Sequence, residues 1–142
     1  MFINIDFTIE KPAPYSNKST LFKTLVYPDA REGYKLKIDF YHDGPKAAET
    51  LLKDGLKHQS SESYYLSGEQ FRSALYYRDT LIRELYFFKN GDTIKNFPSV
   101  NEKEIFHIKL YNTTKNKVIE FDLYDGKIIS GSYHEKNNDN EN

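Results

Sequence analysis

The sequence predicts an all-β protein, an antiparallel meander of β-hairpin repeats with about nine or ten strands. Three observations favour this fold class. Turn signals recur at short, regular intervals along the 142 residues. The segments between them alternate apolar and polar residues with a period of two, as half-buried strands do. Aromatic residues reach 15%, through 12 Tyr and 10 Phe, and such rings favour the pleated surface of a sheet.

Glycines mark most of the turns. They follow at intervals of 11, 11, 13 and 23 residues, at Gly33, Gly44, Gly55, Gly68 and Gly91, and Asp79-Thr80 occupies the slot left in the longest interval. Asx-Gly pairs favour type I′ hairpin turns, because both central residues of such a turn need positive φ. Four pairs of this kind occur, at Asp43-Gly44, Asp54-Gly55, Asn90-Gly91 and Asp125-Gly126.

The alternation is clearest over residues 3–9, 34–40, 71–77 and 119–123. In the second of these segments, Tyr34, Leu36, Ile38 and Phe40 share one face, opposite Lys35, Lys37 and Asp39. In the third, Phe71, Leu75 and Tyr77 share a face opposite Arg72 and Tyr76. We expect each segment to be a strand with one face towards the core.

Two segments also have helical features. Residues 45–53 begin with Pro and end just before Gly55, but the glycine spacing runs through them and favours a strand. Residues 18–27 pair Leu21-Phe22 with Leu25-Val26 at helical spacing, so a short helix packed on the sheet and a strand are equal alternatives. These residues belong to an N-terminal extension, 1–30, in which 11–17 read as a linker. The polar, Asn-rich residues 136–142 are expected to be disordered.

A longer period of about 23 residues joins the hairpins into repeats. Two aromatic residues, two variable residues and a glycine recur at 40–44, 64–68 and 87–91. With its second turn, each unit resembles the variant MORN repeat, and residues 54–65 follow the second half of that repeat with His58 in the family's histidine position. The resemblance is clearest over 34–97 and resumes as a degenerate unit within 104–134. We expect one β-repeat domain over residues 1–135.

The sequence departs from the family at several positions. Gln59 stands where the repeat has its second glycine, Ser61 replaces the usual Trp, and Thr80 and Arg83 replace glycines of the next unit. Bacterial members of the family are often immunity or antitoxin-like proteins, which neutralise a toxin by direct binding. The resemblance therefore implies a hairpin ladder with a protein partner encoded nearby, no cofactor and no catalytic residues.

Composition narrows the function classes. Charges are balanced, with 20 Lys and Arg against 21 Asp and Glu, and no basic block is present. Binding to nucleic acid or to a membrane surface is therefore not expected. Cysteine is absent, which excludes thiolate nucleophiles and zinc–sulfur sites. The first residues lack a signal-peptide pattern and predict a soluble cytoplasmic protein, with an exported form whose signal was removed as the alternative.

Histidines and carboxylates are the residues that could carry chemistry. No histidine lies within three to five residues of another, so no local metal-ligand pair is predicted among His42, His58, His107 and His134. Glu120 and Asp122 would project from one strand face roughly 7 Å apart, a spacing that paired catalytic carboxylates can have. Nothing else marks a substrate site, so we interpret them as solvated residues and predict no metal site and no enzyme.

Tyrosines recur along the repeats at Tyr41, Tyr65, Tyr76 and Tyr86. Successive strands could stack them into columns that hold a thin sheet together, which is the interpretation we favour. The alternative is a tyrosine-rich face that docks a partner. Adjacent aromatic residues point to opposite faces, and a one-layer sheet cannot bury both faces by itself. These four tyrosines are therefore the candidate protein-binding residues.

The sequence thus predicts a non-enzymatic protein-binding module, an immunity- or antitoxin-like protein that binds a toxin. A structural or scaffold repeat protein that self-associates, for example through an exposed sheet edge, is the first alternative. A β-barrel that binds a small ligand or catalyses a reaction is the second, and it requires a sheet that closes around a cavity.

Overall fold

The computed structural model describes residues 5–10, 18–95, 97, 103–112 and 117–137. Within these ranges all strand pairs are antiparallel, which confirms the all-β prediction. The helical structure of these ranges is a single 3-10 turn, η1 (Lys18–Thr20). Backbone contacts divide the chain into two compact units, one of residues 17–99 and one that joins residues 1–16 with 100–142.

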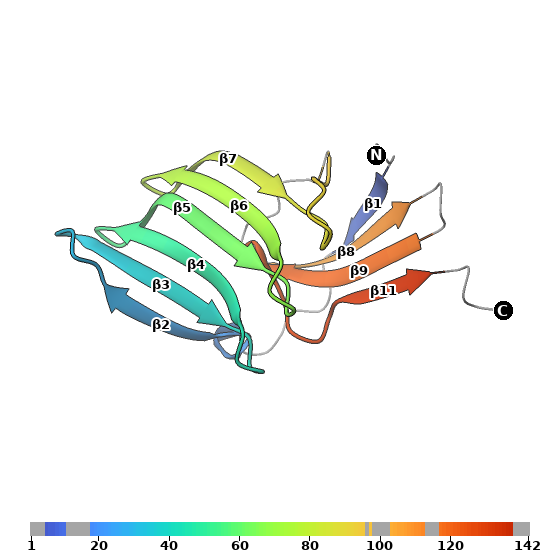
Figure 1. Cartoon of the computed structure of the whole chain (residues 1–142), viewed down its shortest axis with the longest axis horizontal. Helices are drawn as coiled ribbons and strands as arrows, with labels where there is room; N and C mark the ends of the chain where they lie inside the picture. The colour runs from blue at the N-terminus through green and yellow to red at the C-terminus, as the bar shows by residue number, and fades with distance from the viewer. Residues whose placement is uncertain (1–4, 11–17, 96, 98–102, 113–116, 138–142) are drawn as a thin grey trace. The chain divides into compact units, whose positions relative to one another are not determined.

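Residues 17–99 form a six-stranded antiparallel sheet in which each strand pairs with the next along the chain (Figure 1). The strands are β2 (Lys23–Pro28), β3 (Tyr34–Phe40), β4 (Lys46–Lys53), β5 (Leu56–Tyr64), β6 (Gln70–Tyr77) and β7 (Thr80–Tyr86). This order confirms the predicted meander of hairpins. It also leaves β2 and β7 as the two edge strands of the sheet.

The two segments with helical features are both mainly strand. β4 confirms the strand interpretation of residues 45–53. In residues 18–27 the expected helix is limited to the single turn η1, and Lys23 onwards forms β2. Pairing with β3 along the whole of β2 satisfies the backbone there, whereas a helix this short would be marginal in water.

The two-residue turns of the sheet have the predicted type I′ geometry. Asp54 and Gly55 have φ values of 52° and 84°. Arg78 and Asp79 take the same shape without glycine, with φ values of 46° and 69°, in the slot predicted for a turn. The Asp79 carboxylate compensates by accepting the Lys57 backbone N–H at 2.7 Å.

The type I′ prediction is wrong for Asp43-Gly44 and Asn90-Gly91, where only the glycine has positive φ. Here the Gly44 N–H donates to the Tyr41 carbonyl and the Tyr41 N–H donates to the Pro45 carbonyl, both at 2.9 Å. These bonds close a three-residue loop that ends in a left-handed glycine. Such a loop requires positive φ at one residue instead of two.

The aromatic-x-x-glycine signature is this loop, repeated three times. Tyr41, Tyr65 and Phe88 each accept a hydrogen bond from the glycine three residues on, at 2.9 Å. Each also donates its N–H to the carbonyl of the residue four positions on, at 2.8–2.9 Å. The sequence period of about 23 residues therefore corresponds to two strands and the two turns that join them.

Tyrosine hydroxyls link successive repeats. The Tyr41 hydroxyl donates to the Tyr64 carbonyl at 2.5 Å, and the Tyr65 hydroxyl donates to the Phe87 carbonyl at 2.6 Å. In both cases the acceptor is the first aromatic residue of the next repeat. Phe88 takes the place of the tyrosine in the third repeat and has no hydroxyl, so it cannot continue the ladder.

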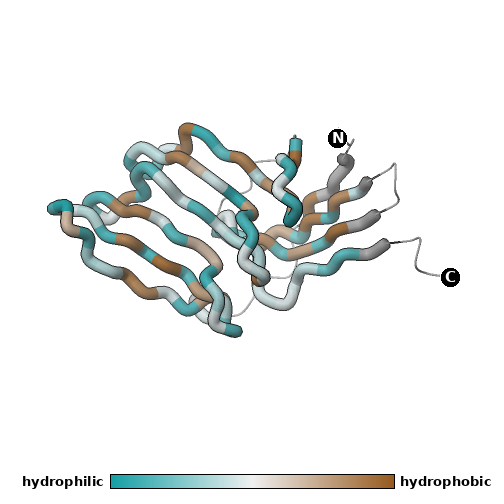
Figure 2. Tube along the Cα trace, viewed as in Figure 1, coloured by the Kyte–Doolittle hydropathy of each residue, from teal (hydrophilic) through white to brown (hydrophobic). Residues whose placement is uncertain are grey.

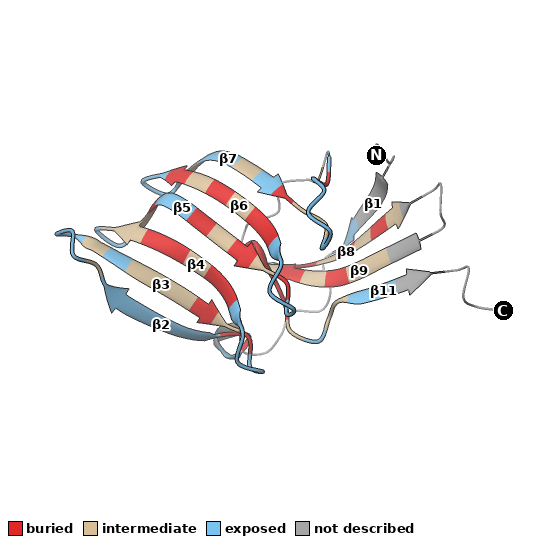
Figure 3. Ribbon diagram, in the orientation of Figure 1, coloured by how far each residue is buried: buried red, intermediate tan, exposed pale blue. Residues whose placement is uncertain are grey.

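The two faces of the six-stranded sheet differ in burial (Figure 3). One row of register neighbours is buried in every strand from β3 to β7, and we call this the inner face: Asp39, Ala48, Ser63, Arg72 and Tyr86. On the opposite, outer face the register row is exposed or half-buried: Leu25, Ile38, Glu49, Glu62, Ser73 and Leu85. Within residues 71–77, Arg72 and Tyr76 are buried and Tyr77 is exposed, whereas Phe71, predicted on the face of Tyr77, is also fully buried, next to a shift in the register of β5 against β6.

The other unit contains a second antiparallel sheet. Its strands are β1 (Ile5–Glu10), β8 (Ile105–Asn112), β9 (Lys117–Tyr124), β10 (Lys127–Ile128) and β11 (His134–Asn137). β8 lies between β1 and β9, and both β10 and β11 pair with β9 on different parts of its length. Asp125 and Gly126 make the predicted type I′ turn, with φ values of 49° and 76°. Figure 2 shows apolar and polar residues alternating along the strands of both sheets.

Three segment predictions can be compared with these elements. The N-terminal extension, 1–30, is divided, because β1 belongs to one sheet and β2 to the other. Lys136 and Asn137, the first residues of the tail expected to be disordered, pair with Val118 and Lys117. The predicted linker, 11–17, and residues 138–142 lie outside the described residues. That residues 1–135 form a single repeat domain stays a prediction.

Candidate functional site

The four tyrosines singled out from the sequence are core residues. Tyr41, Tyr65, Tyr76 and Tyr86 are each exposed by 4% or less. Burial raises the pKa of the Tyr41 and Tyr86 phenols well above the ordinary value of 10. Of the two interpretations of the tyrosine columns, the structure favours packing, because a partner that docks on the surface would not reach these rings.

Two of these tyrosines, Tyr65 and Tyr86, pack against Phe71, which is fully buried. The ring centroids of Tyr65 and Tyr86 lie 5.3 and 5.2 Å from that of Phe71, at interplanar angles of 70° and 64°. This edge-to-face geometry is worth roughly 0.5–1.5 kcal/mol per pair beyond area burial. Aromatic residues of the second and third repeats therefore pack together around Phe71, while Tyr41 of the first repeat packs against Phe22, with ring centroids 6.1 Å apart.

A buried ion pair lies beside this aromatic core. Arg72 is 2% exposed, and its Nε and Nη2 both lie 2.7 Å from Oε2 of Glu84, whose side chain is 9% exposed. Arg72 Nη2 also donates to the Tyr76 hydroxyl at 2.8 Å, and the Tyr86 hydroxyl donates to Glu84 at 3.0 Å. Sequence alternation placed Arg72 on the face of Tyr76, but gave no sign that this charge is buried.

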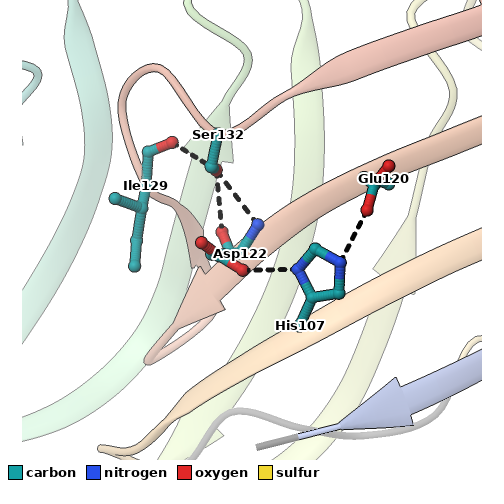
Figure 4. Close-up of polar contacts among 5 residues, drawn as sticks. All are labelled: His107, Glu120, Asp122, Ile129 and Ser132. Carbon is teal, nitrogen blue, oxygen red and sulfur yellow. Dashed lines mark hydrogen bonds and ion pairs between the residues drawn. The ribbon is translucent and has the colours of Figure 1, made fainter. Parts of the chain in front are cut away.

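A second polar cluster lies in the other sheet, where His107 contacts two carboxylates (Figure 4). Its Nδ1 lies 2.7 Å from Oδ1 of Asp122, and its Nε2 lies 2.7 Å from Oε2 of Glu120. The strand register explains the geometry, since β8 and β9 place His107 directly opposite Asp122. Glu120 follows two residues away on the same face of β9, as the sequence predicted for the two carboxylates.

Hydrogen bonds behind the cluster fix Asp122. Its backbone N–H donates to the Ser132 hydroxyl at 3.0 Å, and that hydroxyl donates to the Ile129 carbonyl at 2.6 Å. The segment between β10 and β11 therefore anchors β9 at this point. The sequence contained a signal for the cluster: the polar residues 112–117 separate two alternating segments, and a hairpin centred there pairs position 107 with position 122.

The arrangement favours a protonated histidine. When both ring nitrogens carry a proton, each can donate to one carboxylate, whereas neutral imidazole can donate to only one. The hydrogen bond to Asp122 raises the pKa of His107, burial opposes this rise, and the hydrogen bond to Glu120 adds to it. No group of three or more metal-ligating side chains suited to a cation is found in the described ranges. The cluster can hold a positive charge between two negative ones.

The other histidines have different contacts. His58 is buried, accepts the Arg78 N–H on Nδ1 at 3.3 Å, and packs its ring 5.3 Å from Tyr77 and 6.1 Å from Tyr34. His42 is exposed and bonds to the Thr20 carbonyl. His134 begins β11 and is exposed.

The outer face of the six-stranded sheet is a surface that could contact a partner. Leu25 and Leu85 lie at the two ends of its register row and are exposed by 40% and 43%. Glu49 and Glu62 lie between them, with Glu49 beside Lys46 and Glu62 accepting the Ser73 hydroxyl at 3.0 Å. Burial and these carboxylates raise the pKa of Tyr64 to about 12. The face thus combines apolar ends with an acidic centre.

Comparisons with protein-family models, with curated proteins and with solved structures find no match to this chain. In the part that the structure describes, no helix has the length and apolar character needed to cross a bilayer.

Proposed function

We propose that this chain is a non-enzymatic protein-binding module of variant MORN type, which neutralises a toxin by direct binding as immunity and antitoxin proteins do. The observation that carries the proposal is the outer face of the six-stranded sheet. It runs from Leu25 to Leu85 across all six strands, and each of its register neighbours is exposed or half-buried.

The repeat geometry supports the MORN-type assignment. Three loops with the same hydrogen bonds follow one another at the sequence period, and Tyr41 and Tyr65 link each repeat to the next. Gln59, which stands in place of a repeat glycine, has a φ of 68°, the left-handed conformation that glycine adopts most readily. This conformation supports the alignment of Gln59 with a glycine of the repeat.

The chemistry of the outer face indicates the kind of partner. Exposed leucines at both ends offer apolar contact area, and Glu49 and Glu62 offer acceptors for basic or hydroxyl side chains. A basic enzyme surface would complement this centre. Because the four candidate tyrosines are buried, they are not the proposed contact residues. The proposed contact residues are Leu25, Glu49, Glu62 and Leu85.

A direct test uses the purified protein and the products of genes adjacent to its own. We expect one of them to bind stoichiometrically and to be inhibited, with rescue of growth when both are expressed. Leu85→Lys and Glu62→Lys should each weaken binding by about tenfold or more, as substitutions at interface centres do. Leu66→Lys makes the same change as Leu85→Lys at an equally exposed leucine, 44% against 43%, in the loop between β5 and β6, and serves as the matched control.

Two results would contradict the proposal. One is the absence of binding and rescue with every neighbouring gene product. The other is binding that both outer-face variants retain at full affinity, which would move the interface elsewhere. Of the alternatives, the barrel finds least support, because the six described strands form an open sheet whose edges β2 and β7 are not paired with each other.

A further inference from the structure

The edge strand β2 is exposed along its whole length. All six residues from Lys23 to Pro28 are exposed (Figure 3), including Leu25 at 40%, Val26 at 52% and Tyr27 at 42%. In the described part of the chain, β2 pairs with β3 and with no other strand. A long apolar edge of this kind is a template for a further strand.

The backbone of β2 presents specific groups at this edge. Asp29 donates its N–H to the Tyr34 carbonyl, and Asp54 donates its N–H to the Gly33 carbonyl. The even-numbered residues of β3 therefore face β2 and the odd-numbered ones face β4. In β2, Lys23, Leu25 and Tyr27 bond to β3, and the N–H and C=O groups of Thr24 and Val26 point outward with the carbonyl of Pro28.

These outward groups are complementary to themselves. If β2 of a second copy lies antiparallel with Val26 opposite Val26, each Val26 N–H donates to the other's carbonyl. In the same register each Thr24 N–H donates to the Pro28 carbonyl of the other copy. Pro28 has no backbone N–H, and in this register only its carbonyl takes part in a hydrogen bond. Four hydrogen bonds then form, and no outward donor of β2 is left without an acceptor.

The side chains agree with this register. Leu25 lies opposite Tyr27 of the other copy, in the closely spaced pairs where side chains touch most. Lys23 lies opposite Asp29, a carboxylate that also pairs with Arg31 at 3.0 Å, so that a cation meets an anion at both ends of the contact. The paired Val26 side chains meet on the other face of the sheet. Because the contact is two-fold symmetric, the Leu25–Tyr27 and Lys23–Asp29 contacts each form twice.

We propose that β2 pairs antiparallel with β2 of a second copy about a two-fold axis at Val26, which joins two six-stranded sheets into one. The other edge of the sheet is not equivalent. Beyond β7 the chain folds back, with Phe87 bridged to Thr93 and the Ile94 N–H donating to the Tyr86 carbonyl. This proposal is independent of the partner bound by the outer face.

Sedimentation velocity across a wide concentration range tests the proposal. The mass should rise with concentration from 16.7 kDa towards twice that value. Val26→Pro removes the two central N–H donors but none that bonds to β3, and should weaken self-association by about tenfold or more. Val26→Lys should do the same by placing two like charges at the axis. Ile82→Lys, at a similarly exposed position of β7, should leave the dimer intact.

Crosslinking tests the register itself. The chain has no cysteine, so Val26→Cys introduces a single thiol. Directly opposed residues of a hydrogen-bonded pair lie about 5.5 Å apart between Cα atoms, within the range of disulfides. We expect a covalent dimer for Val26→Cys on mild oxidation and none for Ile82→Cys. A monomer at every concentration, or a dimer that persists in both Val26 variants, would overturn the proposal.

Discussion

The buried pair of Arg72 and Glu84 makes the sharpest prediction for stability. Arg72 is 2% exposed, and both contacts to Glu84 measure 2.7 Å. Replacing Glu84 by Ala leaves the guanidinium buried with the Tyr76 hydroxyl as its remaining partner in this cluster. Removing one member of a buried ion pair typically costs about 3–5 kcal/mol. We therefore expect Glu84→Ala to lower the free energy of unfolding by about that amount.

Milder substitutions separate charge from packing. Glu84→Gln keeps an acceptor oxygen near Arg72 and Tyr86 but loses the negative charge, so its cost should fall to roughly 1.5–3 kcal/mol. Replacing both residues, as Arg72→Met with Glu84→Leu, removes both charges together. The double variant should be far more stable than the two single costs added would predict, with a coupling free energy of about 3 kcal/mol.

Urea unfolding followed by far-UV circular dichroism measures these differences. The pair of Lys46 and Glu49, whose side chains are 42% and 27% exposed, is the control, since Glu49→Gln should change stability by about 0–1 kcal/mol. If Glu84→Ala cost no more than this control, or if the two single changes were additive, the pair would not be buried as described. The account of the inner face would then be refuted.

Three further predictions concern the repeat and the His107 cluster. Gln59→Gly should raise the free energy of unfolding by roughly 0.5–1 kcal/mol in urea titrations, because glycine adopts the left-handed backbone conformation without strain. Ser60→Gly, at the neighbouring position, is the control and should lower it. A loss of stability in Gln59→Gly would contradict this prediction. Tyr41→Phe and Tyr65→Phe should each cost about 1 kcal/mol in the same assay by deleting a hydroxyl that joins two repeats, and equal stability of both variants to wild type would count against the ladder. The folded pKa of His107 is raised above 6.5, so its charge stabilises the fold fully below about pH 6.5 and the contribution is lost as pH rises through the folded pKa. The stability gap between wild type and His107→Gln should therefore be larger at about pH 6 than at about pH 9, and an NMR titration that gave a His107 pKa below 6.5 would refute the ion contacts.

Much of the local structure could be predicted from the sequence, because it depends on near neighbours. Positive φ at Asp54-Gly55 and the strand over 34–40 follow from the residues themselves. The three aromatic-x-x-glycine loops were also visible as a repeat. Their turn type was not, because Asx-Gly fits both a two-residue loop and the end of a three-residue loop, and the pairing of the flanking strands decides between them.

The candidate sites depended more on long-range contacts. The sequence placed Glu120 and Asp122 on one strand face, but His107 joins them through the register of β8 against β9. It placed the tyrosines in columns, but the burial of Tyr41 and Tyr86 depends on contacts with Phe22 and Phe71, which lie far from them in the sequence. The exposed outer face and the free edge of β2 follow from the strand order, which no single segment specifies.

By itself the sequence determined that the chain forms antiparallel strands, most of them joined in hairpins, and that each strand has two distinct faces. Only the tertiary structure decided which face is buried, and it chose the one with Arg72 and Asp39 over the one with Ile38 and Leu25. The physical reason is that a period of two separates the two sets of side chains without ranking them. Burial of a set depends on what packs against it, and for Arg72 the partners are Glu84, Tyr76 and Tyr86 from neighbouring positions in the folded sheet.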